Sequence, residues 1–170
     1  MNYLRVYDSG IQDWRDNVTG SINVTGSSYL VTLMSTSESF TLSGGVYTSD
    51  QGSGATLSLT SGIYKYTTSN GTVAYYDTAL AGTQPTQANA ARVTSMNLPD
   101  GEVITFTYTT LSSGSFDAER IQSINNTLGY QLKFTYATDD PNTSGITLTN
   151  VTAINNAVEY CSPTASSCGL

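Results

Sequence analysis

The acidic side chains are the first candidates for chemistry, because two carboxylates held by separate strands can act as the acid and the base of a hydrolase. The candidates are Asp13, Asp16, Asp77, Asp100 and Glu102. Most of them fall in expected turns, where Asp is favoured because it hydrogen-bonds the neighbouring backbone. The chain has no His, no G-x-S-x-G motif and no phosphate-binding glycine loop. We therefore expect a protein that is not an enzyme and that uses no cofactor.

Potential metal ligands are equally scarce. Cys161 and Cys168 are the only cysteines, and without His two thiolates do not complete a zinc site. They form either one disulfide, in an oxidising compartment, or two surface thiols. The loop Asp139-Asp140-Pro141-Asn142 offers oxygen ligands to calcium but lacks the Gly and the bidentate Glu of a helix-loop-helix site. We expect a solvated turn there and no metal site.

Tyrosines supply the strongest candidate for a ligand surface. Four of the twelve, Tyr64, Tyr66, Tyr75 and Tyr76, flank the dipeptide Asn70-Gly71 and would face one another across a hairpin. An exposed ladder of rings could stack on sugars, whereas cross-strand Tyr pairs also stabilise sheets by roughly 0.2 to 1 kcal/mol each. We favour sheet packing and keep a glycan-binding surface as the alternative.

Two arginines, Arg92 and Arg120, open equivalent segments of the chain. They could clamp a carboxylate or a phosphate. Alternatively, each pairs with an acid such as Glu102 or Glu119, or stacks on a repeat Tyr. Repetition favours the structural role, because a unique site seldom recurs every 28 residues.

The composition indicates a single domain that is nearly all β. Of 170 residues, 11% are charged and 38% are hydrophobic, and Ser, Thr, Gly and Asn are abundant. The net charge of -7 opposes binding to nucleic acid or to an anionic membrane. No window approaches the ~18 apolar residues of a membrane span. The opening MNYLRVYDSG lacks the features of a signal peptide, so we expect either a protein that stays inside the cell or a segment of a longer chain.

Period-two alternation places the strands. It runs through residues 28–34, 55–59, 63–67, 73–76, 103–108 and 131–136. Turn signals separate these runs at Gly44-Gly45, Gly52-Ser53-Gly54, Asn70-Gly71 and Asp100-Gly101. For the last two we expect two-residue hairpin turns with positive φ at both central positions.

A repeat organises the second half of the chain. The stretch RVTSMNLPDGEVITFTY, residues 92–108, returns as RIQSINNTLGYQLKFTY, residues 120–136, and a fainter copy spans 150–160. The shared positions include Arg92, Ser95, Gly101 and Tyr108, then Arg120, Ser123, Gly129 and Tyr136, and finally Tyr160. Each copy is predicted to be an antiparallel hairpin. The chain then divides into an N-terminal β segment (1–78), a connecting segment that is a loop or one helical turn (79–91), the hairpin repeats (92–160) and a tail (161–170).

This pattern resembles the YD repeat of bacterial Rhs proteins and of their teneurin and Tc-toxin relatives. The stretches DWRDNVTGSI (13–22) and YKYTTSNGTVAYYD (64–77) are similar to the segments that lead into such repeats. The Tyr of each copy is followed by Thr109, Ala137 or Cys161 where the family has Asp, and no Gly precedes Arg92 or Arg120.

The resemblance implies consecutive antiparallel hairpins in a twisted, spiralling sheet, as part of a shell that encloses cargo in a larger secreted or surface-exposed bacterial protein. The expected partners are then the remainder of a parent chain or a second copy joined through sheet edges. A carbohydrate-binding or adhesive module at the cell surface is the second hypothesis, and a hydrolase with carboxylate chemistry is a minor third.

Overall fold

A computed structural model describes residues 5–8, 13–81, 89–113, 116–137, 148–166 and 168. The described chain is built from antiparallel strands and one short 3-10 turn, η1 (Thr78–Leu80). The first strands are β1 (Arg5–Asp8), β2 (Asp13–Asp16), β3 (Gly20–Thr25), β4 (Ser28–Leu33), β5 (Thr36–Ser43), β6 (Val46–Ser49) and β7 (Thr56–Thr60). The others are β8 (Ile63–Thr67), β9 (Val73–Asp77), β10 (Asn89–Asn97), β11 (Val103–Ser113), β12 (Phe116–Asn126), β13 (Tyr130–Tyr136) and β14 (Leu148–Asn155).

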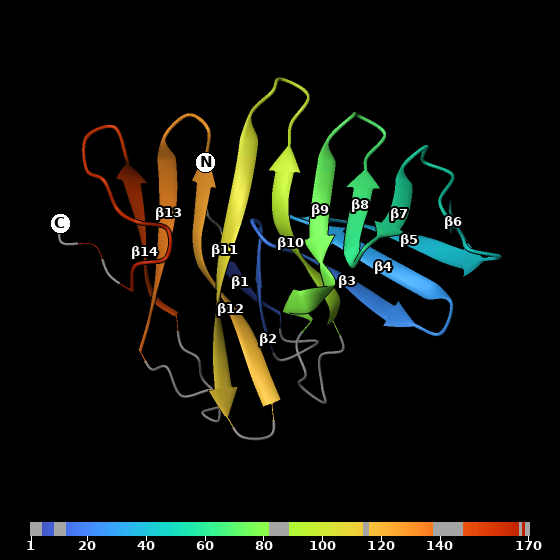
Figure 1. Ribbon diagram of the computed structural model, residues 1–170, viewed down its shortest axis with the longest axis horizontal. Helices are drawn as coiled ribbons and strands as arrows, with labels where there is room; N and C mark the ends of the chain where they lie inside the picture. Colours follow the sequence, from blue (N-terminus) through green and yellow to red (C-terminus); the bar gives the residue numbers. More distant parts are fainter. Residues whose placement is uncertain are drawn as a thin grey trace.

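Strands β7 to β14 form one meander in which each strand pairs with the next (Figure 1). Strands β3 to β6 form a second meander, which joins the first at β10 and completes a 12-stranded sheet. Strands β1 and β2 make a separate hairpin. The expected all-β fold of consecutive antiparallel hairpins is confirmed, as an open sheet.

The sheet forks at β10. One edge of β10 pairs with β9 along residues 92–97, while the other edge is shared by β3, at residues 89–92, and β11, at residues 95–97. Arg92 lies at the fork, between Ser21 of β3 and Asp77 of β9. Because β3 and β11 leave the same edge, they must diverge. In Figure 1, β3 to β5 run behind the strands of the other branch, and β6 lies beyond β7.

The core fills the space between the two branches. The Tyr76 hydroxyl of β9 donates to the carbonyl oxygen of Thr32 in β4 at 3.0 Å, and the rings of Phe40 and Tyr66 lie 6.0 Å apart. The same core continues along the repeats through Ile104, Phe106, Ile124, Leu132 and Phe134. Alternate residues Thr105 and Thr135 are exposed, whereas one face of both repeat hairpins packs against the core, as side chains two apart should.

The turns at Asn70-Gly71 and Asp100-Gly101 differ from the prediction. Only the glycines have positive φ, at 90° and 92°, and the amide of each donates to the carbonyl three residues earlier. These are three-residue loops closed by a glycine, a common hairpin connection, and Gly129 (φ 85°) closes a third one. Gly44-Gly45 does have positive φ at both positions.

The segment expected to connect the two halves is shorter than predicted. Its first residues form η1, its last three begin β10, and residues 82–88 lie outside the described part of the chain. A 3-10 turn forms after β9 because the Asp77 carboxylate accepts a hydrogen bond from the Ala79 amide at 2.8 Å.

A β-bulge recurs along the meander, each time opposite a Tyr. Next to the partner of each of these tyrosines, the following strand carries one extra residue. The tyrosines are Tyr76, Tyr108 and Tyr136. The extra residues are Thr94 in β10, Gln122 in β12 and Thr149 in β14. The first two are equivalent positions of the sequence repeat, so the two clear copies share a bulge as well as a hairpin.

The third copy is corrected in register and in extent. Leu148 lies opposite Tyr136, as Ile121 lies opposite Tyr108, so the structural repeat begins three residues before the alignment that starts at Asn150. It contributes β14 alone, because residues 156–159 form turns and bends instead of a second strand. Tyr160, expected to close the copy, lies outside any strand and is 79% exposed.

Candidate functional site

Strand β13 is buried on both of its faces. Leu132 and Phe134 belong to the core, whereas Gln131 and Lys133 point to the opposite face, which we call the outer face. Even so, Gln131 and Lys133 are only 1% and 2% exposed. Something other than the core must cover them, since long polar side chains are rarely buried so fully without partners.

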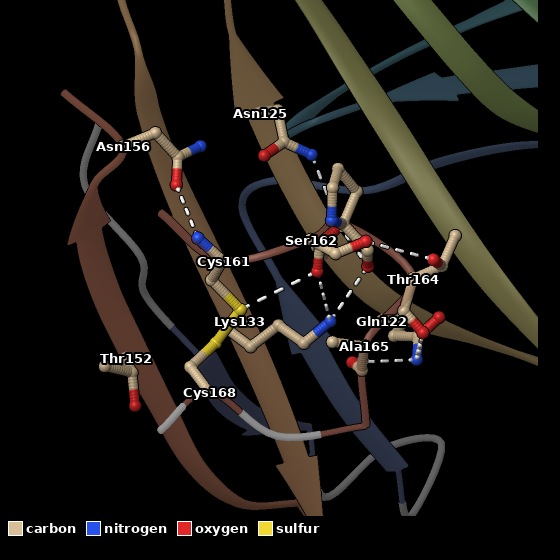
Figure 2. Close-up of a disulfide and its surroundings, with 12 residues drawn as sticks. Gln122, Asn125, Lys133, Thr152, Asn156, Cys161, Ser162, Thr164, Ala165 and Cys168 are labelled. Atoms are coloured by element: carbon tan, nitrogen blue, oxygen red, sulfur yellow. Dashed lines mark hydrogen bonds between the residues drawn. A yellow bond between two sulfur atoms is a disulfide. The ribbon is translucent and has the colours of Figure 1, made fainter. Parts of the chain in front are cut away.

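The cover is the C-terminal loop, of which residues 161–166 and 168 are described. A disulfide joins Cys161 to Cys168 and closes this loop, with the two Cα atoms 5.6 Å apart. Of the two states left open by the sequence, the structure therefore has the bonded one. Figure 2 shows the loop lying against Lys133 and Gln122 on the outer face.

The loop binds the sheet through its main-chain carbonyls. Lys133 Nζ donates to the carbonyl oxygen of Pro163 at 2.8 Å and to that of Ser162 at 3.5 Å. Ser123 Oγ donates to the same Pro163 oxygen at 3.0 Å. Gln122 Nε2 donates to the carbonyls of Thr164 and Ala165 at 3.0 and 3.1 Å. Three side chains of β12 and β13 thus satisfy four consecutive carbonyls.

Lys133 is an uncommon group to find in this position. Its hydrogen-bond partners among the described residues are carbonyl dipoles, without a carboxylate. Burial lowers the pKa of its ammonium group below the usual value, because desolvation disfavours the charged form. Any loss of the loop would return this amine to water.

Further polar atoms are buried on the outer face. Both amide atoms of Gln131 are buried without a hydrogen-bond partner in the described structure, as is Asn125 Oδ1. Asn125 and Gln131 are paired across β12 and β13, and Ile154 of β14 lies beside Gln131. The outer face of β12 and β13 therefore holds buried polar atoms, and the residue of β14 beside Gln131 is the apolar Ile154.

Arg120 and Tyr136 border a cavity of about 220 Å³ that also contacts Gln122 and Ser166. The guanidinium carbon of Arg120 lies 4.3 Å from the centroid of the Tyr136 ring, and the Tyr136 hydroxyl donates to the carbonyl of Ile121 at 2.7 Å. This contact is the stacking on a repeat Tyr that was one of the interpretations of Arg120. Arg92 lies at the fork, with its Nε buried and without a hydrogen-bond partner in the described structure.

The Tyr-rich hairpin is mostly interior. Tyr64 and Tyr76 are cross-strand partners, and with Tyr66 they are at most 5% exposed. This corrects the ligand-surface interpretation for these three residues, which pack the core. Tyr75 points to the other face and is half-buried.

The candidate carboxylates are dispersed. Asp77 and Asp100 cap local turns, the latter by accepting from the Glu102 amide at 3.0 Å, and the Glu102 carboxylate accepts from Asn126 at 2.7 Å. Asp13 and Asp16 lie in β2, whose side chains are outside the described set, and the loop 139–142 is outside it too. Among the described residues, no group of three or more His, Cys, Asp or Glu could hold a metal ion.

Sequence reasoning missed a buried carboxylate at Glu38. Its oxygens accept hydrogen bonds from the hydroxyls of Ser49 (2.6 Å), Ser53 and Tyr66 (3.2 Å). Burial alone would raise the pKa of Glu38, but these hydroxyls together outweigh it and leave the pKa below its usual value. Burial and the charge of Glu38 raise the pKa of Tyr66 to about 12.

The outer face was also missed, although Ser123 was named as a repeat residue. The available signal was Lys133 itself, a charged residue between Leu132 and Phe134 at a position where the equivalent residue of the first copy is Thr105. Such a break in a repeat marks a place where one copy contacts something that the other does not.

No family model matches the chain, and no curated protein matches it. Within the described residues, no helix has the length and apolar character needed to cross a membrane.

Proposed function

We propose that the chain is a non-catalytic structural segment of an Rhs/YD-repeat type of protein, forming part of a β-sheet wall that encloses cargo or docks on the rest of its parent. The observation that carries this proposal is the recurrence of one unit, in which a Tyr lies opposite a bulge in the next strand. A recurring bulge gives each unit the same bend, which is how a meander becomes a curved wall.

The edge of the sheet supports the same proposal. Among the described strands, β14 pairs only with β13, although the matching strands β10 and β12 have partners on both edges. Strand β14 carries no charge and no Pro, the residues that usually block edge pairing. An extended strand of the parent chain or of a second copy would continue the meander there.

The compartment proposed is secreted or surface-exposed, as part of a larger bacterial protein. The disulfide between Cys161 and Cys168 supports an oxidising environment. The alternative is a glycan-binding module. Three of its four candidate tyrosines are buried in the core, and Tyr75 alone is half-buried, so we favour the wall.

Sedimentation velocity over a wide concentration range tests this proposal. We expect the chain to associate as concentration rises, through β14, and Ala153→Lys to weaken the association at least tenfold, since it puts a charge on an exposed edge position. Thr105→Lys is the matched control, because it adds the same charge at an exposed position of β11, a strand paired on both edges. Equal effects of both variants, or a chain that stays monomeric at millimolar concentration, would count against a wall that grows by strand addition.

A further inference from the structure

The C-terminal loop touches the outer face through atoms that every residue possesses. All the acceptors it presents to Gln122, Ser123 and Lys133 are main-chain carbonyls, so its position depends on the path of the backbone more than on its side chains. A short loop that is positioned by its backbone needs its two ends to be held together. The Cys161–Cys168 disulfide is that constraint.

The ammonium group of Lys133 becomes exposed to water when the loop leaves. Lys133 is 2% exposed and hydrogen-bonds only to the Pro163 and Ser162 carbonyls among the described residues. A buried ammonium held by two carbonyl dipoles is poorly compensated, so hydration favours its release once the constraint is removed.

We propose that the C-terminal loop is a redox-operated cover, which is held over Lys133 while the disulfide is closed and uncovers the amine when a dithiol reductant opens it. In that step the S–S bond of Cys161 and Cys168 breaks, each sulfur takes up one electron and one proton, and the reductant becomes a cyclic disulfide. The sheet keeps its structure, because its strands pair with one another and not with the loop.

The chain provides its own internal standard for a test, because it has only two lysines and the other one, Lys65 of β8, is exposed. The full chain is treated with an amine-acylating reagent, oxidised or after reduction with dithiothreitol, and both lysines are followed by peptide mass spectrometry. We expect Lys133 to react at least tenfold more slowly than Lys65 in the oxidised chain, and within about threefold of it after reduction. Cys161→Ser/Cys168→Ser should behave like the reduced chain.

A matched control separates the loop's backbone from its side chains. Among the described residues, the hydrogen-bond partner of Ser162 Oγ is the Thr164 hydroxyl and not Lys133, so Ser162→Ala should leave Lys133 protected in the oxidised chain. Amide exchange in β4, β5 and β9 should stay unchanged on reduction. Equal protection of Lys133 in both redox states would overturn the proposal, as would rapid acylation of Lys133 in the oxidised chain. A loss of amide protection throughout β3 to β9 on reduction would overturn it too, because the disulfide would then hold the whole fold.

Discussion

The guanidinium carbon of Arg120 lies 4.3 Å above the ring of Tyr136, and the hydroxyl of that ring reaches the carbonyl oxygen of Ile121, one residue further along β12. One Tyr therefore holds two consecutive residues of the neighbouring strand beside the bulge at Gln122. The contact therefore joins the first and the last residue of the second copy, 120–136.

This contact can be measured as a coupling energy. In a double-mutant cycle on the free energy of unfolding, Arg120→Ala and Tyr136→Leu should be coupled by about 0.5 to 1 kcal/mol, the range for a half-exposed cation over a ring. Tyr136→Phe is the control, since it keeps the ring, preserves most of that coupling and loses about 1 kcal/mol for the hydrogen bond to Ile121. Additive effects of the two substitutions would show that the stacking carries no energy.

The two faces of the repeat hairpins should differ sharply in mutational cost. Phe106 and Phe134 are buried in the core, so Phe106→Ala or Phe134→Ala should lower the free energy of unfolding by about 3 to 5 kcal/mol. Thr107→Ala and Thr135→Ala, whose side chains point the other way, should each cost well under about 1 kcal/mol. Urea unfolding of the four variants checks this, and similar losses at all four positions would contradict the register.

Acid should weaken the fold partly through Glu38. Because its folded-state pKa lies below the ordinary value, its stabilising effect is present above that ordinary value and is lost as the pH falls through the folded-state pKa. Glu38→Gln should therefore lower the free energy of unfolding by about 1 to 3 kcal/mol at neutral pH, because the hydroxyls lose their hydrogen bonds to a charged group. The stability of the Glu38→Gln variant should also fall less steeply than that of the natural chain between about pH 5 and pH 3. Urea unfolding at several pH values measures both effects, and parallel pH profiles for the two chains would argue that Glu38 is protonated or unimportant.

Local patterning predicted the repeat hairpins well. Strand β8 matches its predicted bounds, and Gly101 and Gly129 close turns where the repeat placed them, because alternation and glycine punctuation are properties of neighbouring residues. Strand β5 escaped detection because its inward position Glu38 is polar, and its partners come from β6, β8 and the loop at Ser53.

The fork and the covered face could not be predicted in the same way. The pairing of β3 with β10 joins residues about seventy positions apart, and no local pattern specifies it. The C-terminal loop reaches β12 and β13 through backbone carbonyls, which leave no mark on the sequence of the loop. Only Lys133, an amine between two core residues, pointed to a contact there.

The most direct test of the wall proposal is amide hydrogen exchange along β14, measured on the full chain at low and at high concentration. In an antiparallel strand alternate amides face opposite edges, so the amides of Leu148–Asn155 that point away from β13 should exchange quickly in the dilute chain. We predict that these alternate amides become protected at high concentration, at least tenfold, while those bonded to β13 change little. Association without new protection in β14, or protection that appears elsewhere in the sheet instead, would contradict growth of the wall by strand addition.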